Sequence, residues 1–478
     1  MRATRWLKWG KRLGIAVVAL VTLGSLVLAF ENYRGRRAWD RYRAESEARG
    51  ERLDLKSFLP AEVPMEENFA ATPLLTPLFD ARWDMKRGEL AYADSNLVAR
   101  LMAMFDWQRY ATVRGPGWRG AEFVDLAAWQ EALRQVTNRV DADLQSLQAR
   151  PRGEPADDLL FLLARDHAAL EELREAARRP HSYVPRSSYD DQLAVWMPYM
   201  GRMKGFARAF QIKAFAELAK GDADAAAADL QAVLGISATL KREPFLISSL
   251  LRLAQLGAVY QPLWEGLARR QWTEAQLAQF EAALGQVNLV EEMAFCLRGE
   301  RAFNLSLLAG QQTGAAGEND GVDSAMAELM RRMPAGWRYQ NQVEIARMYD
   351  QYVLPVLHPE VPMVDVARNL ELEGTTDGLI RQTRHPYRLL AMQLLPAVQR
   401  AALKAAHGQA ELHLARVAVA LERYYLAEGE YPEQLAALSP RFLDTVPVDP
   451  VDGRPLHYRR LEGGRFLVYS LGSRSEER

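Results

Sequence analysis

The stretch Ala214-Phe-Ala-Glu-Leu-Ala-Lys-Gly-Asp-Ala-Asp-Ala-Ala-Ala-Ala-Asp-Leu230 decides the fold class. A helical pattern runs into it and out of it, with one break at Lys220-Gly-Asp222. The repeating positions are Met203, Phe206, Phe210 and Phe215 before the break and Leu230, Val233, Ser237 and Leu240 after it. So short a turn between two helical patterns predicts two antiparallel helices.

The small residues of this hairpin resemble those of a tetratricopeptide-type helix pair, in which two helices approach closely. The resemblance covers one hairpin, and no second copy occurs at the 34-residue period of such arrays. We therefore expect an irregular α-solenoid or a helical bundle instead of a true repeat protein.

Helical patterns continue on both sides of the hairpin. The expected helices run from about residue 121 to Pro151, from about 156 to 177, from Pro244 to Tyr260, and onward from Thr273. The last can open with a capping box between Thr273 and Gln276. His167 lies on the apolar stripe of the second helix, where a packing histidine is expected. Residues 310–322 lack apolar periodicity and are interpreted as a surface loop.

A charge-free segment near the N-terminus, Leu13 to Phe30, is just long enough for a helix to cross a hydrocarbon layer. Basic residues crowd both of its ends, so charge alone does not fix the orientation. A cleaved signal peptide, cut after Val27-Leu-Ala29, is the competing interpretation, and a buried core helix is a third. The stretch is longer than a signal-peptide core, so we expect a retained transmembrane anchor.

The next part of the chain is expected to link the anchor to the body. Residues 31–50 are strongly charged and fit a helical stalk leaving the membrane. Four prolines between Pro60 and Pro77 exclude a regular helix and predict an extended segment lying on the body. Its expected contacts are Phe69, Leu74, Leu75 and Leu78.

The composition is that of a globular protein and argues against nucleic acid as a partner. The 478 residues exceed the usual size of one hydrophobic core, so two or three folding units are expected. Sixty basic and 61 acidic residues leave a net charge of −1, which offers no general attraction for nucleic acid. The single cysteine, Cys296, sits among apolar residues and is expected to be a buried hydrophobe.

The chain changes character after a long alanine-rich helix expected over about 396–428. The segments Leu421-Glu-Arg-Tyr-Tyr-Leu-Ala-Glu-Gly-Glu-Tyr-Pro-Glu-Gln-Leu435, Val446-Pro-Val-Asp-Pro-Val-Asp-Gly-Arg-Pro-Leu-His-Tyr458 and Phe466-Leu-Val-Tyr-Ser-Leu-Gly472 follow in that order. Gly429 can end the helix, and Asp452-Gly453 is a tight-turn signal between extended runs. A helix packed on a small antiparallel sheet is expected.

These roughly 60 residues resemble the C-terminal part of the G-type major pseudopilin of type II secretion systems. The resemblance implies a Gram-negative cell and a body in the periplasm. It has two departures: the pseudopilin processing signature is missing ahead of Leu13, and residues 473–478 stand where the family places a calcium loop. The anchor, helical middle and tail together also resemble a group of uncharacterised bacterial envelope proteins, which supplies no activity.

The search for chemistry assigns no catalytic, cofactor or metal residue. Residues 115–120 match G-x-G-x-x-G, but no parallel-sheet pattern surrounds them, so a turn is expected. His407, Glu411 and His413 come nearest to a metal cluster, yet their spacing places His413 on a different helix face.

The sequence thus predicts a mainly α protein in four segments. They are a cytoplasmic tail and transmembrane anchor (1–35), a charged stalk with a proline-rich extended segment (36–118), a helical domain (119–395) and a pseudopilin-like helix with a small sheet (396–478). The leading hypothesis is a single-pass protein of the bacterial inner membrane whose periplasmic body binds or scaffolds another envelope protein. The alternative is an envelope enzyme whose site combines distant residues such as His181, His358 or His385 with carboxylates.

Overall fold

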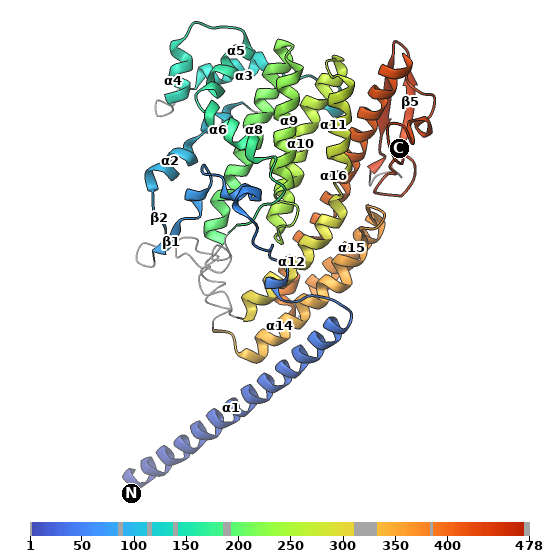
Figure 1. Ribbon diagram of the computed structural model, residues 1–478. Coiled ribbons are helices and arrows are strands. Elements are labelled where there is room, and N and C mark those ends of the chain that lie inside the picture. Colours follow the sequence, from blue (N-terminus) through green and yellow to red (C-terminus); the bar gives the residue numbers. More distant parts are fainter. Residues whose placement is uncertain are drawn as a thin grey trace.

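The computed structural model describes residues 2–84, 89–111, 117–136, 142–184, 193–309, 332–382 and 386–472. Over these residues the fold is mainly α, as the sequence predicts, with small two-stranded sheets as the β structure. Figure 1 shows one long N-terminal helix leaving the body at one end and a small C-terminal module beside the helical body.

The N-terminal helix α1 (Arg2–Ala48) is continuous through both the apolar segment and the charged residues that follow. It is long and apolar enough to cross a membrane, and none of its most apolar window is buried by the rest of the chain. Its C-terminal part instead lies against the body (Figure 1). The charged residues expected to form a stalk are therefore the docked end of α1.

The proline-rich segment wraps the body in short turns because proline excludes longer helices. The turns are η1 (Leu55–Ser57), η2 (Met65–Glu67), η3 (Phe69–Ala71) and η4 (Thr76–Leu78). Phe69, Leu75 and Leu78 are fully buried and Leu74 is half-buried, so the expected contacts are confirmed. The hydrophobic core thus includes this segment.

The sequence analysis did not anticipate the next elements. A hairpin pairs β1 (Ala81–Asp84) with antiparallel β2 (Glu89–Tyr92). Helix α2 (Ser95–Ala103) follows, opened by Asp94, whose side chain accepts the Leu97 N–H. Two 3₁₀ turns complete the region, η5 (Asp106–Tyr110) and η6 (Gly117–Gly120).

Each of the two helices expected over 121–177 is divided in two. The observed elements are α3 (Leu126–Gln135), α4 (Ala142–Ala149), α5 (Pro155–Ala164) and α6 (His167–Ala176). The prediction of one helix up to Pro151 was wrong because Val136 takes extended backbone, in a stretch of poor helix formers, Val136-Thr-Asn138. The prediction of one helix over about 156–177 was wrong because Asp166, a residue type with low helix propensity, stands at the start of a new helix.

The central hairpin is confirmed as α8 (Leu193–Lys220) and α9 (Ala223–Ala238), which pack together. Gly221 supplies the left-handed turn between them, at φ +80°. Helix α10 (Leu246–Ala268) starts after the expected Pro244 because Phe245 is extended. The capping box at Thr273 is confirmed at the start of α11 (Glu274–Gly285).

The helices beyond the hairpin form an irregular bundle instead of a solenoid. Helix α11 packs mainly against α16 (Leu389–Glu428), and α10 packs against α8, α9 and α16, whereas a repeat array would pair α10 with α11. Helix α12 (Leu289–Ala309) also packs on α16. The alanine-rich helix expected from Pro396 in fact begins at Leu389.

The lower body joins α12, α14 (Ala335–Met348) and α16 around a second core. A π-helical turn, η7 (Tyr349–Val353), continues α14 directly. The remaining elements are η8 (Leu354–Val356), β3 (Leu357–His358), β4 (Met363–Val364), α15 (Val366–Gln382) and η9 (Pro386–Arg388). The loop expected over 310–322 lies outside the described residues.

The C-terminal module follows the expected order. Gly429 ends α16 in the left-handed region at φ +82°, and Gly453 forms the expected tight turn at φ +72°. The turn η10 (Leu435–Leu438) precedes β5 (His457–Leu461), which pairs with antiparallel β6 (Arg465–Tyr469). A third apolar core, which includes Tyr431, lies between this hairpin and the end of α16.

Candidate functional site

The junction between α1 and the body combines polar contacts with close packing. From Gly35 onward α1 has a buried stripe, at Gly35, Tyr42 and Ser46, with Ala38 and Trp39 half-buried. These positions recur at helical spacing, so one face of the charged segment faces the body while its arginines stay in solvent.

Two glycines let α1 and α14 cross in backbone contact. A Cβ added at Gly336 would stand 2.5 Å from the carbonyl oxygen of Glu31, and one added at Gly35 would collide with the carbonyl oxygen of Gly336. Small residues of this kind allow the closest helix crossings. The crossing begins one residue beyond Phe30, the last residue of the apolar segment.

Asn32 on α1 also supplies the missing cap of α14. The Gly336 N–H lies in the first turn of α14, where backbone donors lack a helical partner, and Pro334 offers no side-chain cap. The Asn32 Oδ1 accepts this N–H at 2.6 Å. The start of α14 is thus completed by a side chain of the membrane-directed helix.

Beyond the crossing, Arg301 of α12 is fully buried and gathers the acidic groups of the junction. Its Nη1 donates to Asp350 Oδ1 at 2.6 Å, and its Nη2 donates to the Glu51 carboxylate. Asp350, on the π-helical turn η7, also accepts the Tyr42 hydroxyl at 2.6 Å. One arginine therefore connects α12, the turn after α14 and the end of α1.

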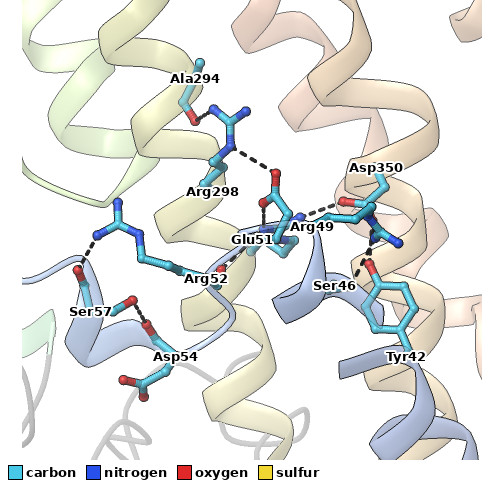
Figure 2. A network of polar contacts seen from close by, with 11 residues as sticks. Tyr42, Ser46, Arg49, Glu51, Arg52, Asp54, Ser57, Ala294, Arg298 and Asp350 are labelled. Carbon is cyan, nitrogen blue, oxygen red and sulfur yellow. Dashed lines mark hydrogen bonds and ion pairs between the residues drawn. The ribbon is translucent and has the colours of Figure 1, made fainter. Parts of the chain in front are cut away.

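Figure 2 shows how Tyr42, Arg49 and Asp350 converge on one side of this network, while Glu51 lies between Arg49 and Arg298. Arg49 reaches Asp350 at 3.5 Å and Arg298 reaches Glu51 at 3.7 Å. Burial and the neighbouring Asp350 carboxylate raise the pKa of Tyr42 to about 12, so its hydroxyl stays a donor at neutral pH.

A groove on the upper body is the second feature. It encloses about 800 Å³ between α6, α9, α10 and α11. Many of its lining residues are small, and the exposed small ones are Ala228, Ala238 and Ala282. Arg178 and Lys241 stand among the lining residues as exposed cations.

Ion pairs join the helices around the groove to one another and to neighbouring helices. Arg174 of α6 pairs with the fully buried Asp229 of α9, which Lys213 of α8 also contacts at 3.0 Å. Arg252 of α10 pairs with Glu292 of α12. Ion pairs with well-matched partners in the interior hold their helices in register, because breaking one leaves an uncompensated charge. These pairs therefore join α6 and α8 to α9, and α10 to α12.

Searches with protein-family models, curated proteins and solved structures found no match. Function is therefore argued from the chain itself.

The structure does not bring the histidines of the enzyme hypothesis into one site among the residues it describes. His181 lies beside Glu67, at 3.8 Å, and His358 lies beside Glu360, at 3.7 Å. His385 is outside the described residues. No group of three or more His, Cys, Asp or Glu side chains in the described part of the chain could hold a metal ion.

The other residues weighed from sequence also have structural surroundings. Cys296 is fully buried, as expected, and burial raises the pKa of its thiol. His167 is exposed, so its expected packing role was wrong; its ring lies 3.8 Å from Glu171. His407 is exposed while His413 is buried, and Glu411 pairs with Arg119, so the helix separates the three.

The G-x-G-x-x-G stretch has no dinucleotide-binding surroundings in its described part. Gly117 to Gly120 form η6, and the Trp118 N–H donates to the Gln261 side chain of α10. The expected turn is confirmed for these residues, while 115 and 116 lie outside the described ones.

The junction residues were missed from sequence. A local signal did exist for α1, since Gly35, Ala38, Tyr42 and Ser46 recur every three or four residues between charged neighbours. No local signal pointed to Gly336, Arg301 or Asp350, because their role depends on partners far along the chain.

Proposed function

We propose that this protein is a single-pass protein of the bacterial inner membrane whose periplasmic body binds another envelope protein, acting as a scaffold without catalysis. One observation carries the proposal: α1 is a single helix whose apolar half is not buried by the described part of the body and whose other half is fixed to it. A helix of this form fixes the position of the body relative to the membrane.

The rigid junction supports a scaffold. A flexible linker would let the body point in any direction, whereas the Gly35–Gly336 crossing and the buried Arg301 network hold α1 at a set angle to α12 and α14. The groove is then presented at one height and one orientation above the membrane. The resemblance of the tail to a pseudopilin module supports a periplasmic location for this body.

Topology is tested with a C-terminally tagged full-length chain in intact spheroplasts. External protease should remove the tag and leave a short protected N-terminal fragment. Protection of the whole chain would place the body in the cytoplasm and contradict the location.

Binding is tested by crosslinking in membranes and purification of the full-length chain. The double variant Ala228→Arg, Ala282→Arg fills the groove from exposed positions, and Ala427→Arg, exposed at the end of α16, is the matched control. We expect one stoichiometric envelope protein with the wild type and the control and its loss with the double variant. Equal recovery of the partner with all three chains would remove the groove from the proposal. Recovery of the wild-type chain without any partner would contradict binding.

A further inference from the structure

Two aromatic side chains form a patch on the body, level with the point where α1 would leave the membrane. It consists of Trp337 of α14 and Tyr387 of η9, whose rings meet edge to face with centroids 5.7 Å apart. Trp337 is 38% exposed, which is unusual for so large an apolar side chain beside a core. We call these two residues the aromatic pair.

The aromatic pair is fixed to the first turn of α1 beyond the apolar segment. The Tyr387 hydroxyl donates to Glu31 Oε1 at 2.6 Å, and Arg34 donates to the same hydroxyl at 3.1 Å. The Arg34 guanidinium also lies 5.6 Å from the Tyr387 ring centroid. Trp337 directly follows Gly336, which touches the backbone of Glu31.

The depth of this patch follows from helix geometry. A helix rises about 1.5 Å per residue, so the eighteen residues from Leu13 to Phe30 span about 27 Å, close to the hydrocarbon thickness of about 30 Å. The headgroup region adds roughly 6 Å on each side, which is about four residues of helix. Residues 31–34 occupy that layer, and the aromatic pair is bonded to them.

The chemistry of the patch suits that layer. Tryptophan and tyrosine favour the membrane interface because one end of the ring is apolar and the other forms hydrogen bonds. Three arginines adjoin the pair: Arg34 contacts the Tyr387 hydroxyl, Arg388 directly follows Tyr387, and the half-buried Arg338 directly follows Trp337. Basic side chains at this level attract anionic phospholipid headgroups.

We infer that Trp337 and Tyr387 rest in the phospholipid headgroup layer of the membrane that α1 crosses, so that the body contacts this membrane at a second place. The inference depends on the proposed function only in taking α1 as the membrane span. The span and this second contact together would fix the tilt of the body relative to the membrane, so its groove would be held at one inclination.

The test uses the full-length chain in vesicles of phosphatidylcholine and phosphatidylglycerol, with an environment-sensitive fluorophore on one introduced cysteine. Native Cys296 is fully buried, and the labelled wild type gives its background. The sites are Trp337→Cys, Arg338→Cys, which keeps Trp337, Leu20→Cys inside the span, and Leu426→Cys, exposed at the far end of α16. Quenchers are placed in water, at the headgroups or deep in the acyl chains.

The expected result is strongest quenching of residues 337 and 338 by the headgroup quencher, of residue 20 by the deep quencher and of residue 426 by the aqueous quencher. If residues 337 and 338 behave like residue 426 while residue 20 is deep, the second contact is wrong and the anchor stands. If residue 20 is quenched from water, the anchor itself fails and the inference fails with it. Circular dichroism of each labelled chain verifies that it is folded.

Discussion

Gly35 of α1 and Gly336 of α14 meet backbone to backbone just beyond the apolar half of α1, with no room for a Cβ on either residue. This contact places the body against the first turns that leave the apolar segment. It is also a position at which the docking of α1 can be weakened without replacing a residue of the apolar core.

Replacing Gly35 by valine should force α1 and α14 apart. Overpacking of a close contact costs about 1–3 kcal/mol, and here both obstructing groups are backbone, so relief requires moving a helix. We expect faster hydrogen exchange in residues 31–48 and at the start of α14. The control is Gly374→Val on α15, where an added Cβ meets nothing within 4 Å. Unchanged exchange at both sites would refute the crossing.

Replacing Arg301 by methionine should destabilise the lower body by about 3–5 kcal/mol, because Asp350 and Glu51 lose their buried partner. Arg298→Met is the control on the same helix: its ion pair with Glu51 is partly exposed and should contribute less than about 1 kcal/mol. Both values come from denaturant unfolding of the full chain in detergent.

The network also predicts that the losses of unfolding free energy caused by two substitutions will not add. Adding Asp350→Asn to Arg301→Met removes the carboxylate that has lost its Arg301 partner, so the double variant should be less destabilised than the sum of the single variants. Strict additivity would mean that Arg301 and Asp350 do not interact in solution.

His413 should make the fold sensitive to mild acid. Burial lowers the pKa of its imidazole to about 4, and its Nδ1 lies 2.8 Å from the Val448 carbonyl oxygen while Nε2 lies 2.7 Å from the Gln409 amide nitrogen. A base with a lowered pKa in the folded state stabilises the fold above its unfolded pKa of about 6.5, and this contribution is lost as pH falls towards 4.

The size of that loss is about 3 kcal/mol at most, since one pKa unit corresponds to about 1.4 kcal/mol. Unfolding free energies at pH 7 and pH 4 should therefore differ less for His413→Gln than for the wild type. His407→Gln, at an exposed position of the same helix, should follow the wild type. If His413→Gln loses as much unfolding free energy between pH 7 and pH 4 as the wild type, another group causes the acid sensitivity.

Glu217 should act in the opposite direction. Burial, with a smaller effect of Asp229, raises the pKa of Glu217 to about 8. An acid with a raised pKa stabilises the fold below its unfolded pKa of about 4.5, and this contribution is lost as pH rises through 8. Glu217→Gln should therefore be less destabilised than the wild type between pH 6 and pH 9. The exposed Glu175→Gln should leave the wild-type profile unchanged, and identical profiles for all three chains would refute the shift.

Sequence alone determined the parts of this protein that depend on neighbours along the chain. Gly221 and Gly429 marked helix ends, Thr273 marked a helix start, and the uncharged run from Leu13 to Phe30 marked the helix that can cross a membrane. Each of these signals arises from backbone conformation or solvation within a few residues. They were sufficient for the fold class and the C-terminal module.

Tertiary structure alone decided what the charged end of α1 does. Asn32 and Gly336 are 304 positions apart, and the Arg301 network joins three segments, so neither could be read from local spacing. Charged residues along the chain look alike whether they are solvated or paired, because the difference lies in partners that only the folded chain supplies. The helix breaks at Val136 and Asp166 were missed for a different reason: they lie at residue types with low helix propensity, which apolar periodicity does not record.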